Sequence, residues 1–254
     1  MSKLLILVFT VFMSAIANAT DVGKEQRWAE QVEANLFDGE MIYLEAEGHK
    51  FLGILMEVEG AKGAIVLAHG TGVHPDWEQV INPLRVGLAE QGWNTLSIQM
   101  PVLPNEVGHD EYAPVFPEAG PRLAAAADYF AGQSPVVLVA HSLGAAMSTW
   151  YMKHEPNPPY QGFVGIGMGG SAGQFKTYME ADNVSSLKSV NLPMMDLYGA
   201  EDFENVVGTA SARAASQQHN TGFKQVVAAD SNHFFDGQED LLISLVSDWL
   251  EGLE

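Results

Sequence analysis

The chain has 254 residues, of which 12 are Lys or Arg and 32 are Asp or Glu, so its formal net charge is −20. This balance argues against nucleic acid as a partner, because phosphates are bound by basic side chains. With 47% hydrophobic residues the chain is not disordered, and its length suits one large core. The absence of Cys excludes disulfides, thiolate metal sites and a cysteine nucleophile.

The first nineteen residues have the three parts of a secretory signal. Lys3 precedes the apolar run Leu4–Met13, and small residues follow up to Ala17-Asn18-Ala19. The run is much shorter than the roughly 20 apolar residues of a membrane span, so we expect no stable membrane insertion. We predict cleavage before Thr20 and export to the periplasm or the medium.

The next segments predict a helical lead-in and then a β-hairpin. Residues 20–39 are charged and amphipathic, which favours a short helix. Glu40–Glu47 and Lys50–Glu59 alternate apolar and polar residues around a Gly-His turn, which is typical of two paired strands.

From Gly63 onward, apolar strand-like runs alternate with helical stretches. The strand candidates are Ala64–His69, Trp93–Met100, Pro135–Ala140, Gly162–Met168, Leu192–Tyr198 and Phe223–Ala228. The helix candidates are Pro83–Glu90 (with Asn82 as its N-cap), Pro121–Gly132, Leu143–His154, Asn205–His219 and Gln238–Leu250. This alternation predicts an α/β fold, with a mostly parallel twisted sheet and helices on both faces, over residues 40–254. Two long loops are expected at Pro101–Gly120 and Gly169–Asn191, and such loops often bind ligands.

The strongest motif is Ala140-His141-Ser142-Leu143-Gly144, between a β-branched run and a helical stretch. It is close to the G-x-S-x-G nucleophile elbow in its strand–turn–helix context, although alanine replaces the first glycine. A serine on such a sharp turn requires small neighbours, and Ala140 and Gly144 meet that need. We predict Ser142 as a nucleophile, and a chance match at a helix start is the alternative.

A serine nucleophile needs a base and a group that orients the base. Asp202 follows a predicted strand end, on the same sheet edge as Ser142, and is the first choice for the acid. Glu201 and Asp196 are the alternatives. His233 follows the next strand and is the predicted base.

An oxyanion hole is predicted from two backbone N–H groups, those of Thr71 and Leu143. Thr71 lies in the Gly-rich turn after the first parallel strand, and Leu143 follows the nucleophile. A metal site formed by His69, His74 and Asp76 is the alternative for this turn. Their spacing matches no common metal signature, so we expect no metal and no other cofactor.

From Ile42 to the C-terminus the chain resembles the α/β-hydrolase superfamily. The resemblance rests on His69-Gly70, the Ser142 elbow, Gly199-x-x-Asp202 and His233, and the elbow is similar to the A-H-S-M-G elbow of some small bacterial lipases. More narrowly, residues 69–77, Gly92-Trp93 and residues 100–104 resemble an uncharacterised proteobacterial family of exported α/β-hydrolase-like proteins. These resemblances imply an α/β-hydrolase fold and, more generally, hydrolysis.

The sequence therefore favours an exported serine hydrolase that acts on a small-molecule carboxylic ester through an acyl-enzyme. The alternatives are a non-catalytic binding protein with the same fold, and a peroxidase or lyase with the same triad. His69, Gly70, His74, Tyr112 and Phe116 are candidates to line the substrate site. For Tyr112 and Phe116, anchoring of the loop to the core is an equal alternative.

Acidic residues also concentrate near the predicted catalytic edge, with Glu201 and Glu204 on either side of Asp202. The loop at residues 101–120 has four acidic residues and no Lys or Arg. A solvated acidic surface is the first explanation for this charge. The alternative is an effect on the substrate, which predicts that neutral or cationic esters are preferred over anionic ones.

Overall fold

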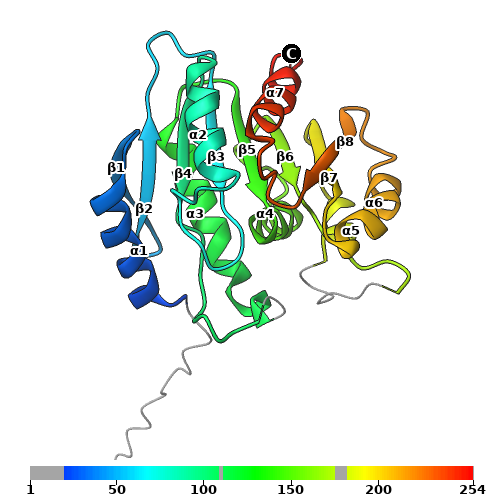
Figure 1. Ribbon diagram of the computed structural model, residues 1–254, viewed down its shortest axis with the longest axis horizontal. Coiled ribbons are helices and arrows are strands. Elements are labelled where there is room, and N and C mark those ends of the chain that lie inside the picture. The colour runs from blue at the N-terminus through cyan, green and yellow to red at the C-terminus, as the bar shows by residue number, and fades with distance from the viewer. Residues whose placement is uncertain (1–19, 109–110, 175–181, 254) are drawn as a thin grey trace, which may run out of the picture.

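The computed structural model describes residues 20–108, 111–174 and 182–253. The predicted signal peptide lies outside these residues. Figure 1 shows a central twisted sheet with helices on both faces, and the first helix packs against the hairpin edge of the sheet.

The described residues form a single eight-stranded sheet in the order β1-β2-β4-β3-β5-β6-β7-β8. The pairs β1/β2 and β2/β4 are antiparallel, and every other neighbouring pair is parallel. The strands are β1 (Glu40–Ala46), β2 (His49–Met56), β3 (Ala64–Ala68), β4 (Asn94–Ile98), β5 (Val136–His141), β6 (Gly162–Ile166), β7 (Met194–Glu201) and β8 (Phe223–Asn232). The predicted hairpin and mostly parallel sheet are confirmed.

Helices cover both faces, as predicted. The helices are α1 (Val22–Asn35), α2 (Ile81–Glu90), α3 (Phe116–Tyr129), α4 (Leu143–His154), α5 (Asn183–Leu187), α6 (Glu204–Ser216) and α7 (Glu239–Leu250), with a 3-10 turn, η2 (Ala113–Val115), before α3. Helices α2 and α7 pack on one face, and α3, α4 and α5 pack on the other. Within the described part of the chain, no helix combines the length and the apolar character that crossing a bilayer requires.

The central strand β3 shows why the sheet has a core on each side. All five of its residues are buried. Ala64, Val66 and Ala68 face the α3–α4 layer, and Ile65 and Leu67 face the α2–α7 layer. Alternate side chains of a strand point to opposite faces, so a strand covered on both sides must be apolar throughout.

Three local predictions were wrong. Helix α2 begins at Ile81 with Val80 as its N-cap, and the Asn82 side chain donates to Asp76 instead of capping the helix. Helix α3 begins at Phe116, five residues before the predicted Pro121, which lies inside the helix. The expected loop at Gly169–Asn191 contains the short helix α5, capped by the Asp182 carboxylate.

Candidate functional site

Ser142 lies on a strained turn between β5 and α4. Its backbone has φ 54° and ψ −119°, a left-handed conformation that is uncommon for a residue with a side chain. Gly144 permits the close approach of the backbone at the end of β3, because a Cβ there would lie 2.4 Å from the carbonyl oxygen of His69. The small residue at this elbow position is therefore a steric requirement.

A chain of hydrogen bonds joins Ser142, His233 and Asp202. The Nε2 atom of His233 lies 2.9 Å from the Oγ atom of Ser142, and its Nδ1 atom lies 2.6 Å from the Oδ1 atom of Asp202. The Asp202 carboxylate can only accept when ionised, so Nδ1 donates to it and Nε2 is left to accept the serine proton. The three residues come from β5/α4, the end of β7 and the end of β8.

The structure distinguishes the three candidate acids. The side chain of Asp202 is fully buried, and its Oδ1 atom also accepts the backbone N–H of Phe203 at 2.6 Å. Glu201 is exposed. Asp196 is buried inside β7, where its Oδ2 atom lies 2.9 Å from Nε of Arg213. Among the three, Asp202 is thus the acid that contacts His233.

Gly167 and Phe203 hold the His233 ring on two sides. Gly167 has φ +63°, and a Cβ there would lie 2.9 Å from Cε1 of His233. The Phe203 ring stacks on the imidazole with centroids 4.2 Å apart and an interplanar angle of 25°. These contacts leave the imidazole little freedom to rotate away from Ser142.

His141, the elbow residue before Ser142, packs against His233. Its Nε2 atom lies 3.0 Å from the backbone oxygen of His233, and the two ring centroids are 4.8 Å apart. Burial is the main cause, and proximity to His233 the second, of a His141 pKa that is lowered to about 3. A neutral His141 donates to the His233 carbonyl and supports the loop that carries the base.

A cavity of about 450 Å³ opens at Ser142. Its walls come from both predicted loops, from the elbow and from the segments around Asp202 and His233. The residues that line it are Gly70, Thr71, Val73, Trp77, Ala113, Phe116, His141, Ser142, Leu143, Ala146, Gly167, Gly169, Asn183, Phe203, Asn205, Val206, His233 and Phe234. The predicted residues Gly70 and Phe116 are thus at the cavity wall.

Both proposed oxyanion donors, Thr71 and Leu143, are among these lining residues. Leu143 is the first residue of α4, and the first N–H groups of a helix have no acceptor within it. The positive end of the helix dipole also lies here, so the position suits a developing negative charge.

The other three predicted lining side chains make their contacts elsewhere. His69 is buried, its Nε2 atom accepts the backbone N–H of Met100 at 3.0 Å, and burial lowers its pKa to about 3. His74 packs between the rings of Trp28 and Trp77, with centroid distances of 4.9 and 5.4 Å. The Tyr112 hydroxyl accepts the N–H of Leu103 at 3.0 Å. Tyr112 therefore anchors the loop, which was the alternative considered for it.

The metal alternative for the turn at residues 69–76 gains no support from the geometry. The Asp76 carboxylate forms an ion pair with Arg85, whose side chain is fully buried. Across the described ranges, no group of three or more His, Asp or Glu side chains is arranged to hold a metal ion.

Sequence reasoning missed several apolar residues of the cavity wall, including Val73, Phe203, Val206 and Phe234. Phe203 and Phe234 each adjoin a predicted site residue, and this adjacency was the available signal. Phe203 is also 56% exposed, so part of its ring is open to solvent at the cavity.

Comparison with known proteins supports the fold and gives one family match. A family described as a protein of unknown function (DUF3530) matches residues 15–120. The sequence has no match among curated proteins. Because the family match covers less than half of the chain, the resemblance to a proteobacterial family stays a prediction.

Solved structures with this fold cover most of the chain at low sequence identity. Dienelactone hydrolase from Anabaena variabilis is 18% identical, with a TM-score of 0.67 over 85% of this chain and 98% of its own. Est1E from Butyrivibrio proteoclasticus is 15% identical, with a TM-score of 0.63 over 85% and 99%. An alpha-beta serine hydrolase homologue from Coxiella burnetii is 17% identical, with a TM-score of 0.60 over 84% and 99%. The chain has an α/β-hydrolase fold, as predicted.

Proposed function

We propose that the protein is a serine hydrolase that cleaves carboxylic esters through an acyl-enzyme. One observation carries the proposal: the Ser142–His233–Asp202 hydrogen-bonded chain, with distances of 2.9 and 2.6 Å, opens on a cavity. The structural neighbours include a dienelactone hydrolase and a serine hydrolase homologue, which is consistent with the proposal.

In the proposed reaction, Oγ of Ser142 attacks the ester carbonyl carbon while Nε2 of His233 takes the hydroxyl proton. The N–H groups of Thr71 and Leu143 stabilise the oxyanion of the tetrahedral intermediate. His233 then protonates the leaving alcohol, and the acyl group remains on Ser142. Water, activated by His233, releases the acid in the second half of the reaction, and Asp202 stabilises the imidazolium each time it forms.

The cavity favours a neutral ester with an apolar acyl group. The side chains of Trp77, Phe116 and Phe234 contribute apolar surface, and the lining residues described by the structure include no Lys, Arg, Asp or Glu. A carboxylate on the substrate would lose water there without gaining a cationic partner, which is unfavourable. Acidic residues outside the cavity add to this preference at low salt.

The proposal is tested by fluorophosphonate labelling and by hydrolysis of p-nitrophenyl esters. We expect Ser142-dependent labelling, and turnover of p-nitrophenyl butyrate to exceed that of p-nitrophenyl hemisuccinate by at least about tenfold, or about 1.4 kcal/mol. Absence of labelling would favour a non-catalytic binding protein. Activity that requires added peroxide would favour a peroxidase, and faster turnover of the hemisuccinate would contradict the proposed substrate class.

Export is part of the proposal and is carried by the signal sequence Met1–Ala19. Expression of the full chain in a Gram-negative host, followed by fractionation, tests it. We expect the ester-hydrolysing activity in the periplasmic fraction or the medium, and retention in the cytoplasm would contradict export.

A further inference from the structure

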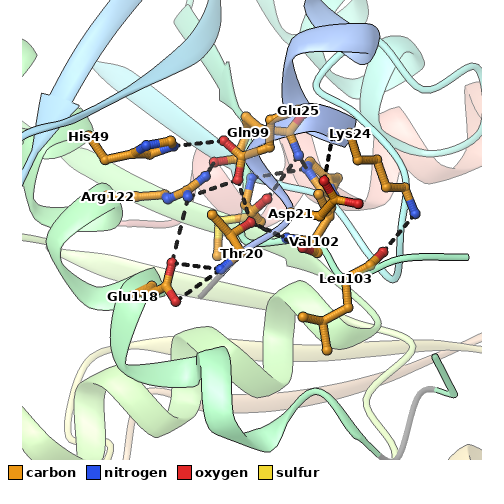
Figure 2. Close-up of polar contacts among 12 residues, drawn as sticks. Thr20, Asp21, Lys24, Glu25, His49, Gln99, Val102, Leu103, Glu118 and Arg122 are labelled. Atoms are coloured by element: carbon orange, nitrogen blue, oxygen red, sulfur yellow. Dashed lines mark hydrogen bonds and ion pairs between the residues drawn. The ribbon is translucent and has the colours of Figure 1, made fainter. Parts of the chain in front are cut away.

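Thr20, the residue that follows the predicted cleavage point, is buried within the folded protein. It is 7% exposed, and its backbone nitrogen lies 3.1 and 3.3 Å from the two carboxylate oxygens of Glu118 on α3 (Figure 2). Its hydroxyl contacts Oε1 of Glu25 and the backbone of Val102. Both oxygens of one carboxylate therefore converge on one backbone nitrogen, although a peptide N–H has a single proton to donate.

The two carboxylates near this nitrogen differ in how closely a basic side chain approaches them. Nη2 of Arg122 lies 2.9 Å from Oε1 of Glu25 and 4.0 Å from Oε2 of Glu118. The Arg122 and Glu25 side chains are 2% and 7% exposed, and that of Glu118 is 32% exposed. Glu25 also has Nε2 of His49 at 2.9 Å from its Oε2 atom, so Glu118 is the carboxylate with the more distant basic partner. A positive charge at the Thr20 nitrogen would give Glu118 a close cationic partner.

We propose that Glu118 is the binding site of the α-ammonium group that cleavage before Thr20 creates. The ligand class is a primary ammonium, and the proposal rests on the export proposed above. Cleavage replaces a neutral amide by a cation with three protons, two of which have acceptors in the Glu118 carboxylate. A weak bifurcated contact becomes a charge-assisted pair.

The bound terminus braces the start of the loop that leads to the cavity. The N–H of Asp21 donates to the Val102 carbonyl at 2.7 Å, and Nζ of Lys24 donates to the Leu103 carbonyl at 3.0 Å. Nη1 of Arg122 donates to the Gln99 carbonyl at 2.9 Å. The ammonium site thus ties α1 and α3 to the segment that follows β4, and processing at Thr20 would stabilise that junction.

The site makes a prediction about pH. An α-amino group has an ordinary pKa of about 8, and the Glu118 carboxylate raises the pKa of this group in the folded protein. A raised folded pKa stabilises the fold below about pH 8, and this contribution is lost as the pH rises through the raised value. The charged or titratable groups that face the site are Glu118 and Arg122 on α3, Asp21, Lys24 and Glu25 at α1, and His49 on β2.

The experiment uses the full chain, exported with its own leader, and begins with N-terminal sequencing. We expect the mature chain to begin at Thr20, and any other start would overturn the proposal. The melting temperature is then compared between the wild type and Glu118→Gln at pH 7 and pH 10. We expect Glu118→Gln to lower it by about 2–4 °C at pH 7 and by much less at pH 10.

Glu111→Gln is the matched control, because it removes the same charge from an exposed position before the same helix. It should change the melting temperature little at either pH. The Lys24 ammonium also titrates in this range, because burial lowers its pKa, but it is common to all three proteins. An equal effect of Glu118→Gln at both pH values would mean that Glu118 binds only a neutral N–H, and would overturn the proposal.

A second chain, expressed with Asn18 and Ala19 retained before Thr20, keeps an amide at the site. We expect it to melt below the mature protein at pH 7 by about the same 2–4 °C, and the effect of Glu118→Gln to become independent of pH in it. An unchanged melting temperature would contradict the proposal. N-terminal sequencing and melting temperatures do not depend on ester hydrolysis. A negative result for the ammonium site would therefore leave the proposed function unaffected, and an inactive enzyme would leave the ammonium site unaffected.

Discussion

Asp202 and His233 lie 31 positions apart in the chain, and their side chains meet at 2.6 Å in a nearly solvent-free setting. The contact forms because β7 and β8 are parallel neighbours, so the residues after both strands reach the same sheet edge. Glu201, which immediately precedes Asp202, is exposed at that edge. These two adjacent acids therefore provide a matched pair for testing the proposed mechanism.

Asp202→Asn should lower kcat by about 10⁴-fold, the loss seen when the orienting carboxylate of a serine protease is replaced. The amide would no longer hold the His233 tautomer that leaves Nε2 free to accept a proton. Hydrolysis of p-nitrophenyl butyrate gives the measurement. Glu201→Gln is the control and should retain near wild-type turnover, so a comparable loss in both variants would remove Asp202 from the mechanism.

Ser142→Ala should lower kcat by several orders of magnitude and abolish fluorophosphonate labelling. It should not lower the melting temperature, because alanine needs no hydrogen-bond partner at the turn. Ser148→Ala is the control, since the Ser148 hydroxyl donates within α4 to the Gly144 carbonyl and lies away from the cavity wall. Retained turnover in the Ser142 variant would show that the activity has another source.

Gly167→Ala should lower kcat/KM by at least about tenfold, because its Cβ would lie 2.9 Å from Cε1 of His233 and displace the ring. Gly173→Ala is the matched control for Gly167→Ala. Gly173 has φ +58°, close to the +63° of Gly167, but a Cβ there would meet no atom of the residues that the structure describes within 4 Å. Both variants place an alanine at a similar positive φ, so the difference between their activities reports the displacement of His233. Equal activities would contradict this explanation.

Asp196→Asn should lower the free energy of unfolding by about 3–5 kcal/mol, because it leaves the fully buried Arg213 without an anionic partner. Urea unfolding measures the change. Glu251→Gln breaks the half-exposed ion pair with Lys62 and should cost no more than about 1 kcal/mol. A change in the free energy of unfolding of less than about 1 kcal/mol for Asp196→Asn would mean that the contact with Arg213 does not require the negative charge of Asp196.

The buried histidines should make the protein less stable in acid. The pKa values of His69 and His141 are lowered to about 3 by burial, whereas an unfolded histidine has a pKa of about 6.5. Below about pH 6.5 the unfolded chain therefore takes up protons that the folded chain excludes, and stability falls as pH falls. Each histidine contributes a slope of up to about 1.4 kcal/mol per pH unit.

His141→Gln should remove its share of that slope between about pH 6 and pH 4, as measured by urea unfolding at several pH values. His154→Gln is the control, because His154 is exposed at the end of α4 and should leave the slope unchanged. An unchanged slope in the His141 variant would mean that His141 is protonated in the folded protein within this range.

Local sequence was sufficient to predict the order of the strands and of the longer helices, and the nucleophile turn, but not the short helix α5. The β3 run Ala64–Ala68 is apolar throughout because it is covered on both faces, and that pattern is visible without coordinates. The elbow was recognisable because its strained turn excludes large side chains at Gly144, where a Cβ would strike the His69 carbonyl oxygen. Burial on both faces of a strand and the need for small residues at a sharp turn each act over a few consecutive residues, so they can be recognised in the sequence.

Only the tertiary structure decided which side chains meet. Asp196, Glu201 and Asp202 fall within seven positions, and the irregular β7/β8 register between Gly199 and Glu201 accompanies their different directions. Tyr112 and Phe116 come from one predicted loop, yet the first bonds the backbone at Leu103 and the second lines the cavity. A contact between distant segments depends on strand register and on how the helices pack, and neither leaves a pattern that short-range spacing can reveal.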